Sequence, residues 1–346
     1  MATEVIKKYT QILSTLPDYV MDFFLDENTR YQPKTKLAYA VDLRVFFWWI
    51  IDTAPQDINR TKLSEVTKQD LDKLRARDIN LYMMWLEQYE MPDFVTGKKE
   101  VYENSPSGQK RKLAVLKSFF KFLYREEYIL QDPTALVKTP KIKEKEIFIL
   151  SEGEKDRILN EADTGRSKAD HAKSFHSHSK YRDMAILSTF LGTGIRVSEL
   201  VNINLYDLDF TEQRILVTRK GGNREYVYFN STVLDALTDY LDIERASLAK
   251  IDPEKDEDGP LFVSNRGTRI TVGRVEQIVK EYAHYILPAS SKATPHTLRK
   301  TYGTELYQKY KDIYLTQKAL GHSSPITTER YYAKFDPSML KKLRDE

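Results

Sequence analysis

The sequence predicts a mainly helical protein of two domains, the second of which also contains a small β-hairpin. Its 346 residues, 41% of them hydrophobic, exceed one typical domain and suffice for two cores. Apolar residues recur at helical spacing over 33–54 and 107–129. By contrast, 214–229 holds two β-rich runs around the turn Lys-Gly-Gly-Asn. The first part is therefore expected to be helical and the second to be mixed.

A linker is expected where the apolar periodicity breaks. Pro133 and Pro140 are followed by the alternating charges of KIKEKE, and a new helix is expected after Ser151, a suitable N-cap with Glu154 three residues on. We place the helical domain, the linker and the second domain at 1–138, 139–147 and 148–346.

Composition excludes several classes of protein. Without cysteine there can be no disulfide, thiolate nucleophile or cysteine metal site, and a reducing, cytoplasmic location is expected. We find no export signal and no run of eighteen apolar residues, so no membrane contact is expected. A net charge of +3, from 54 basic and 51 acidic residues, does not by itself indicate a nucleic-acid partner. The distribution of charge is more informative.

The helix expected over 107–129 has a basic face opposite an apolar one. No acidic residue lies between Gly108 and Tyr124, and Lys112 is the only cation on the apolar side. A solvated amphipathic helix is the alternative, although such faces usually mix signs. A face of one sign suits a phosphate backbone. The candidate DNA-binding residues are Lys110, Arg111, Lys117, Lys121 and Arg125.

The polar stretch 164–180 holds three of the six histidines, His171, His176 and His178. No carboxylate or cysteine stands at a spacing that would complete a metal site. We expect a solvated surface insertion, no metal and no cofactor.

Four short segments of the second domain concentrate cations, two histidines and three tyrosines. They are GTGIRVSEL (192–200), RKGG (219–222), HTLRKTYGTEL (296–306) and LGHSSPITTERYY (320–332). Glu199 follows Arg196 by three residues, which fits either a surface ion pair or a phosphate-binding arginine oriented by its carboxylate. Lys220 is either a solvated turn lysine or a ligand contact that the flanking glycines allow.

A further helix is expected to start with Thr294 as N-cap and Pro295 in its first turn. His296 and Arg299 would then lie one turn apart near the positive end of the helix dipole, where two cations are unfavourable. A bound anion would resolve that conflict.

These residues suit phosphoryl transfer. The segments contain no Ser-His-acid arrangement, no phosphate-binding glycine loop and no acidic cluster for magnesium. Arginines and histidines can neutralise the transition state without metal, and a lysine can protonate a leaving oxygen. A tyrosine that attacked a phosphodiester would keep the bond energy in a phosphotyrosine, so no ATP would be needed to reseal a strand.

Taken in order, the four segments resemble the signature segments of the tyrosine recombinase (phage integrase) family, including the nine-residue step from His322 to Tyr331. The helical stretches at 31–50 and 107–141 are similar to the family's core-binding domain and its link to the catalytic domain. The chain looks closest to Xer recombinases, especially those that act alone in some Gram-positive bacteria.

The resemblance implies a role for each site residue. Tyr331 would attack the scissile phosphate to leave a 3'-phosphotyrosine and a 5'-hydroxyl, and Lys220 would protonate the leaving oxygen. The remaining implied roles are phosphate binding by Arg196 and Arg299, support of Arg196 by Glu199, and hydrogen bonding or proton transfer by His296 and His322. Tyr332 lies about 100° further around a helix and cannot share the position of Tyr331.

Two departures from the family pattern concern basic residues. Lys300 stands where many relatives have histidine, outside the catalytic set. In the hairpin, Lys220 aligns with the family pattern, but the second basic residue is shifted to Arg224, whereas relatives often show a lysine nearer the turn.

The resemblance to the family also implies binding partners. A C-shaped clamp of a helical core-binding domain and an α/β catalytic domain would close on double-stranded DNA at a specific site. Four copies would act on two DNA sites, whose strands would pass through a Holliday junction. The tail at 336–346 would be a docking helix in that assembly. A DNA translocase or accessory protein would be a further partner. Xer-type chromosome dimer resolution by a nucleoid-associated enzyme is expected. The alternatives are a mobile-element integrase, an inactive DNA-binding regulator and a type IB topoisomerase.

Overall fold

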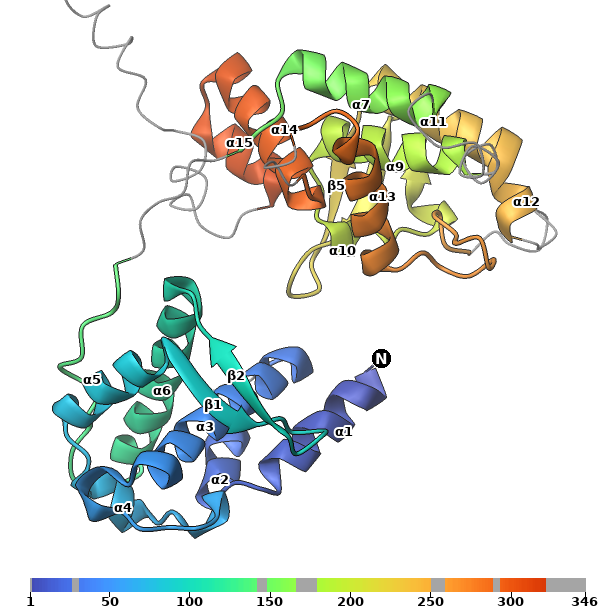
Figure 1. Cartoon of the computed structure of the whole chain (residues 1–346). Helices are drawn as coiled ribbons and strands as arrows, with labels where there is room; N and C mark the ends of the chain where they lie inside the picture. The colour runs from blue at the N-terminus through green and yellow to red at the C-terminus, as the bar shows by residue number, and fades with distance from the viewer. Residues whose placement is uncertain are drawn as a thin grey trace, which may run out of the picture. The chain divides into compact units, whose positions relative to one another are not determined.

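The chain divides into two compact units, Met1–Lys145 and Glu146–Glu346 (Figure 1). The computed structural model describes residues 2–26, 31–141, 148–165, 179–249, 259–288 and 293–321. The expected linker, 139–147, includes the division between the units, but most of it lies outside these ranges. The functional assignment of the two domains stays a prediction. Among the described residues, no helix is both long and apolar enough to span a membrane.

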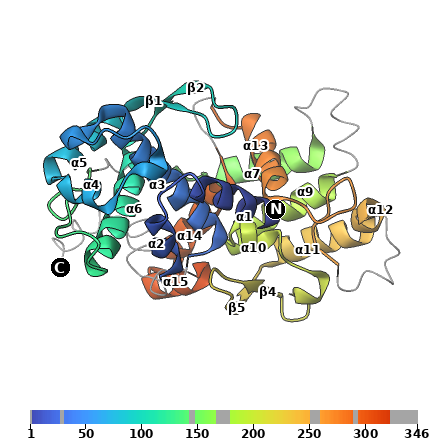
Figure 2. The same ribbon diagram turned by 90° about the horizontal axis from the view of Figure 1, so that it is seen from below.

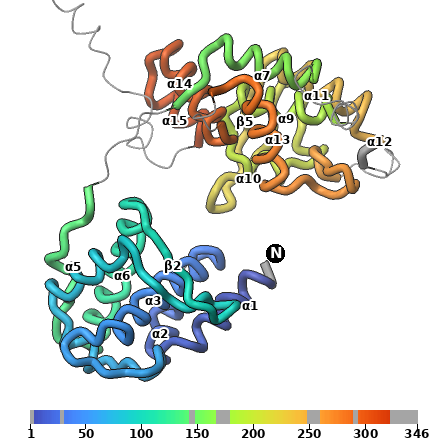
Figure 3. Tube along the Cα trace, viewed as in Figure 1, coloured from blue at the N-terminus to red at the C-terminus, as the bar shows by residue number. Residues whose placement is uncertain are grey.

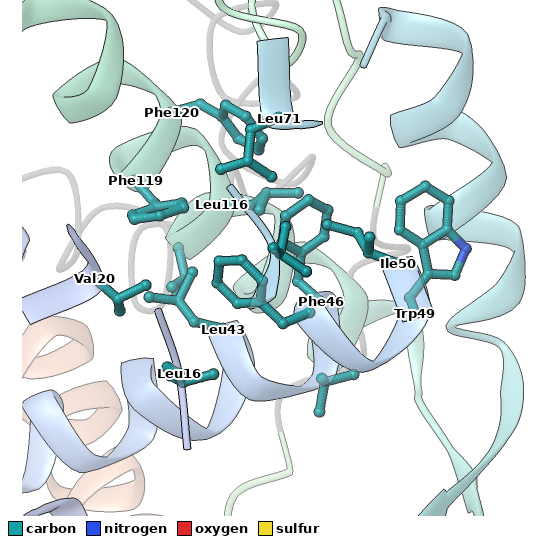
Figure 4. Packing of buried hydrophobic residues seen from close by; sticks show 14 of the residues in the cluster. Leu16, Val20, Leu43, Phe46, Trp49, Ile50, Leu71, Leu116, Phe119 and Phe120 are labelled. Atoms are coloured by element: carbon teal, nitrogen blue, oxygen red, sulfur yellow. The ribbon is translucent and has the colours of Figure 1, made fainter. Parts of the chain in front are cut away.

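The first unit is built mainly of helices (Figure 2), which pack around a core rich in aromatic side chains. They are α1 (Ala2–Leu13), α2 (Tyr19–Leu25), α3 (Pro33–Thr53), α4 (Lys68–Lys73), α5 (Ala76–Trp85) and α6 (Pro106–Arg125), with 3₁₀ turns at Pro55–Asp57 and Leu63–Glu65. Phe46 of α3 meets Phe120 of α6 edge to face, with ring centroids 5.7 Å apart, and Leu43 and Leu116 are buried beside them (Figure 4). Such packing of large apolar side chains dominates the stability of the unit.

α6 ends four residues before the periodicity predicts. Glu127 has a φ of +57°, and the Tyr128 amide donates to the Leu123 carbonyl at 2.8 Å. A left-handed residue of this kind closes a helix C-terminus. Tyr128 packs edge to face on Phe122 beyond that turn, so it contributes to the apolar face without being helical.

A β-hairpin that the sequence analysis did not predict interrupts the helices of this unit. Strands β1 (Gln88–Pro92) and β2 (Lys99–Glu103) pair antiparallel, with Tyr89 opposite Tyr102. Stacking of Trp85 on Tyr89 and of Tyr89 on Tyr102, at 4.3 and 5.4 Å between centroids, attaches the hairpin to the core. QYEMP is short and ends in proline, and KEVYE is short and has three charged residues, so neither has the composition by which strands are recognised.

The second unit is mixed, as expected (Figure 3). Its helices are α7 (Glu152–Thr164), α9 (Lys180–Thr193), α10 (Val197–Leu200), α11 (Ser231–Asp239), the π-helix η4 (Tyr240–Arg245), α12 (Ala246–Ala249), α13 (Val272–His284), α14 (Pro295–Tyr310) and α15 (Ile313–Leu320). A 3₁₀ turn (Leu205–Asp207) leads into β3 (Leu208–Asp209), β4 (Arg214–Thr218) and β5 (Arg224–Tyr228), an antiparallel sheet in the order β3-β4-β5. The hairpin β4–β5 confirms the prediction for 214–229.

α9 is the central helix of this unit and packs against α7, α11 and α14. Phe190, Ile186 and Leu187 of α9 are fully buried in the core. Both expected helix starts are confirmed. Ser151 and Glu154 form a capping box at α7, and the Thr294 hydroxyl accepts from the Thr297 amide ahead of Pro295 at α14.

Candidate active site

The C-terminal end of α15 organises the site. The last carbonyls of a helix lack intrahelical partners and carry the negative end of its dipole. The consecutive carbonyls of Ala319, Leu320 and Gly321 each accept a hydrogen bond from a different arginine. The donors are, in the same order, Nη2 of Arg219 at 3.1 Å, of Arg299 at 2.6 Å and of Arg196 at 2.9 Å. Three guanidiniums from three separate elements therefore converge just before His322.

Arg196 and Glu199 make the contact that their spacing predicts, with a different geometry. Arg196 is the N-cap of α10, not a residue within it, and its backbone amide donates to Glu199 Oε2 at 2.8 Å. Its Nη1 donates to Oε1 of the same carboxylate at 2.7 Å. The Glu199 side chain is 2% exposed and that of Arg196 is 31% exposed. A buried carboxylate thus orients a guanidinium that still reaches solvent.

Arg219 is part of the site although the sequence analysis did not single it out. Its side chain is 6% exposed, and its Nη1 lies 2.9 Å from Glu199 Oε2. Its Nε lies 3.2 Å from Glu225 Oε2 on the other strand of the hairpin. Arg219 therefore ties the turn that carries Lys220 to both Glu199 and α15. The sequence does contain a signal for this role, because Arg219 and Glu225 stand on either side of the glycine turn.

Arg299 is buried on α14. Its Nη1 donates to the Gly194 carbonyl at 2.6 Å, besides the bond to Leu320. Gly194 ends α9 with a φ of +62°, and a Cβ there would lie 2.3 Å from Tyr302 Cδ1. Glycine is required at this position because the chain must turn there against a ring.

His296 lies one turn before Arg299 at the exposed start of α14. Partial burial of the imidazole lowers the pKa of His296, and the charges of Lys300 and Arg299 lower it further. Arg196 acts in the same direction. The ring is consequently neutral at pH 7, when it can donate from one nitrogen and accept at the other.

Lys220 is exposed at the hairpin tip, followed by Gly221 and Gly222 at φ of 99° and 92°. A cavity of about 520 Å³ opens beside it. Its lining comes from the hairpin and α15: Arg219, Lys220, Asn223, Glu225, Tyr314, Gln317, Lys318 and Gly321. Arg224, the displaced second basic residue, is ion-paired with Asp207 at 2.6 Å.

Several predicted residues lie outside the described part of the chain. These are His322, Tyr331, Tyr332, the tail at 336–346 and the three histidines His171, His176 and His178. Within the ranges that the structure does describe, no group of three histidine, aspartate or glutamate side chains is placed to hold a metal ion.

The five basic residues predicted on α6 fall into three groups, namely two exposed lysines, two arginines paired with carboxylates, and Lys117, whose Nζ donates to a carbonyl. Lys110 and Lys121 are exposed. Arg111 Nη1 lies 2.6 Å from Oδ2 of the buried Asp42, and Arg125 Nη2 lies 2.7 Å from Asp26 Oδ2. Carboxylates thus compensate the charge of these two arginines.

Two lysines of α6 are directed inward. Lys117 Nζ donates to the Val137 carbonyl at 2.7 Å. Lys112, the cation on the apolar side, is buried and lies 3.2 Å from Asp42 Oδ1. Burial raises the pKa of Asp42, against the opposing effects of Lys112 and Arg111. The apparent intruder is therefore half of a buried ion pair.

Known proteins are similar to this chain over most of its length. The model of the phage integrase family matches residues 150–337. Tyrosine recombinase XerC of Caldanaerobacter subterraneus subsp. tengcongensis is 32% identical over 343 residues, covering 96% of this chain and 86% of its own. Tyrosine recombinase XerS of Streptococcus agalactiae is 27% identical over 348 residues, covering 94% of each chain. The solved structure of the Tn1549 transposon integrase, in complex with circular intermediate DNA, has a TM-score of 0.65 at 19% identity, with 99% of both chains covered.

The fold thus combines a helical unit with a mixed unit in which three guanidiniums converge on the C-terminal end of a helix. The chain belongs to the phage integrase family, the tyrosine recombinases, whose members are DNA strand-exchange enzymes. The resemblance of the four sequence segments is thereby confirmed, as are the mainly helical fold class and the class of enzyme.

Proposed function

We propose that this chain is a site-specific recombinase of the Xer type, which cuts and rejoins DNA strands through a 3'-phosphotyrosine. The observation that carries the proposal is the convergence of Arg196 and Arg299 on the carbonyls that immediately precede His322. The XerC and XerS relatives, which match along nearly the full chain, support the Xer type.

In the proposed cleavage step, the Tyr331 hydroxyl oxygen forms a bond to the scissile phosphorus and the bond from phosphorus to the 5'-oxygen breaks. The phenolic proton passes to a histidine or to solvent, and Lys220 gives a proton to the leaving oxygen. Attack by a 5'-hydroxyl on the phosphotyrosine reverses the step on a new strand. The number of phosphodiester bonds is unchanged, so the reaction needs no cofactor.

Arg196 is suited to bind the non-bridging oxygens. A guanidinium has five N–H donors in a fixed plane. Within the described residues, the Arg196 side chain uses one donor on Glu199 and one on Gly321, and a third of its surface is exposed. Because both anchors are fixed before DNA arrives, the remaining donors meet the phosphate with little reorganisation.

His296 is proposed as a hydrogen-bonding and proton-transfer group. Its lowered pKa keeps the ring neutral at pH 7, so an N–H can donate to a phosphate oxygen without adding a further cation. His322, the next residue after Gly321 in the sequence, is proposed to complete this set.

The proposed partner is double-stranded DNA carrying a specific site. Lys110 and Lys121 are proposed to contact its phosphate backbone, since both are exposed on one helix. A tetramer on two sites, docking of the tail at 336–346, and an accessory protein or DNA translocase complete the proposal, for a cytoplasmic, nucleoid-associated enzyme.

The alternative within the same chemistry is a mobile-element integrase. The similarity to the Tn1549 integrase favours neither role, because at 19% identity it concerns the fold alone. Strand exchange between two chromosomal dimer-resolution sites would favour the Xer role, whereas exchange only at the ends of a mobile element would favour the alternative.

The test of the chemistry is a nicked suicide substrate carrying the host's candidate site, incubated with wild type, Tyr331→Phe and Tyr332→Phe and resolved on a denaturing gel. A covalent adduct that only Tyr331→Phe abolishes is the expected result. Binding to the site without any adduct, with no added partner restoring one, would instead support a DNA-binding regulator. Relaxation of supercoils without exchange between two marked sites would support a topoisomerase.

A further inference from the structure

Strand β2 leaves one edge of the N-terminal hairpin free. Across the sheet, α3 covers the outer edge of β1. There Trp48 Nε1 donates to the Glu90 carbonyl at 3.0 Å, and Arg44 Nη2 donates to the Pro92 carbonyl at 3.0 Å. β2 has β1 as its single strand partner within the described part of the chain. Figure 2 shows the hairpin at the margin of its unit.

The alternation of hydrogen-bonded pairs in the hairpin determines which main-chain groups of β2 point to that edge. The Asp93 amide donates to the Lys98 carbonyl at 2.8 Å, and the Asn104 amide donates to the Glu87 carbonyl at 3.3 Å. Hydrogen-bonded pairs alternate along an antiparallel ladder. Even-numbered residues of β2 therefore bond to β1, and the main-chain groups of the odd-numbered residues point outward.

The outward groups belong to Lys99, Val101 and Glu103, whose side chains share one face of the strand. On the opposite face, Tyr102 stacks on the buried Tyr89. All three outward residues are exposed, and Val101 is 58% exposed. The free edge therefore presents main-chain donors and acceptors, one apolar side chain and two opposite charges.

We propose that β2 pairs antiparallel with β2 of a second copy of this chain, about a two-fold axis at Val101. This register sets Lys99 opposite Glu103 of the other copy, twice by symmetry, and Val101 opposite Val101. These pairs are the hydrogen-bonded pairs that the outward main-chain groups require. Cross-strand pairs of opposite charge stabilise such a ladder, and a two-fold contact is self-complementary.

Other two-fold registers of the same edge are less favourable. An axis at Glu100 sets Glu100 against itself, and like charges directly opposite destabilise a sheet. An axis at Tyr102 sets Val101 against Glu103 and leaves Lys99 without an acidic partner. Charge on an edge strand ordinarily prevents pairing. In the register centred on Val101, by contrast, Lys99 of each copy lies opposite Glu103 of the other, and these charges attract.

Pairing along one short strand buries less surface than a stable dimer requires, so the free protein is expected to associate weakly. The contact would act together with any others that bring copies of the chain together. It is independent of the recombinase role, because it uses no residue of the candidate active site.

The test is a thiol cross-link on the full chain, which contains no cysteine. In Val101→Cys, paired strands place the two Cα atoms about 5.5 Å apart, within the range that a disulfide bridges. The matched control is Val95→Cys, 81% exposed in the hairpin turn and away from the proposed axis. We expect Val101→Cys to form the disulfide dimer under mild oxidation, several-fold faster than Val95→Cys.

Charge reversals in the Val101→Cys background test the register. Lys99→Glu and Glu103→Lys should each slow cross-linking by roughly two- to tenfold, and the double reversal should restore it. The two single variants change net charge in opposite directions, so a shared loss cannot arise from net charge. Equal rates for the two cysteine variants, no dimer, or indifference to the charge reversals would overturn the proposal. Far-UV circular dichroism confirms that each variant is folded.

Discussion

Glu199 holds two arginines at once: its Oε2 lies 2.9 Å from Arg219 Nη1 while its Oε1 accepts from Arg196 Nη1 at 2.7 Å. The carboxylate is buried, as is Arg219. One acid thus couples the turn bearing Lys220 to the arginine proposed to bind phosphate. A substitution of Arg219 should therefore affect DNA cleavage indirectly, through Glu199 and the turn that bears Lys220.

Replacing Arg219 by Met should abolish most phosphotyrosine formation and lower the free energy of unfolding by about 3–5 kcal/mol, because it leaves the buried Glu199 with one cation. Glu225→Gln is the control, since Glu225 is a third exposed and lies 3.2 Å from Arg219 Nε. Adduct yield on the suicide substrate and urea unfolding measure the two effects. A fully active, stable Arg219→Met would contradict the assigned position of this residue.

Gly321→Ala should weaken both stability and cleavage. The residue has a φ of +59°, and an added Cβ would lie 2.6 Å from Arg219 Nε. A loss of about 1–3 kcal/mol is expected from the backbone conformation, and displacement of Arg219 should reduce cleavage. Gly153→Ala is the matched control, because a Cβ in that turn of α7 meets no atom within 4 Å. Thermal unfolding should show a lower midpoint temperature for Gly321→Ala than for the wild type and an unchanged one for Gly153→Ala.

His296 should titrate below the ordinary histidine pKa, and Lys300→Gln should raise its pKa part of the way back. Burial, the largest cause, would remain. Because the folded-state pKa lies below the unfolded one, the free-energy advantage of the neutral ring is present above the unfolded pKa and is lost as pH falls through the folded value. NMR titration of the imidazole measures this, with Lys309→Gln at the far end of α14 as control. An unchanged pKa in Lys300→Gln would exclude the charge effect.

The exposed lysines of α6 and its buried Lys112 should separate experimentally. Lys110→Ala and Lys121→Ala should weaken DNA binding and lower its salt dependence by about one counterion each, with little effect on stability. Lys112→Met should instead destabilise the protein by about 3 kcal/mol, since it breaks a buried pair with Asp42. Binding isotherms over a range of salt, with urea unfolding, distinguish the two. A loss of stability in Lys110→Ala would contradict the division.

Much of the fold could be predicted from periodicity and end signals. The two long helices of the first unit, the hairpin at 214–229 and the caps at Ser151 and Thr294 follow local rules of spacing and hydrogen bonding. Hairpin β1–β2 could not be found in this way. Its strands are short, and stacking on the neighbouring Trp85 and a hydrogen bond from Trp48, 42 residues before Glu90, hold it in place.

For the candidate site, residue type and spacing indicated Arg196, Glu199, His296 and Arg299, and the structure gathers them. Arg219 escaped notice because its role depends on partners from other elements, of which Ala319 lies 100 residues away in the sequence. The ion pairs of Arg111 and Arg125 escaped for the same reason: a helical wheel shows which way a side chain points but not which acid from another segment lies there.

The anchoring of Arg299 has a mechanical consequence. Its guanidinium is held by the Gly194 carbonyl, at the end of α9, and by the Leu320 carbonyl, at the end of α15. One side chain of α14 thus bridges the ends of two helices that lie far apart in the sequence. The direction of the guanidinium therefore depends on both helix ends at once, and a shift of either would turn it.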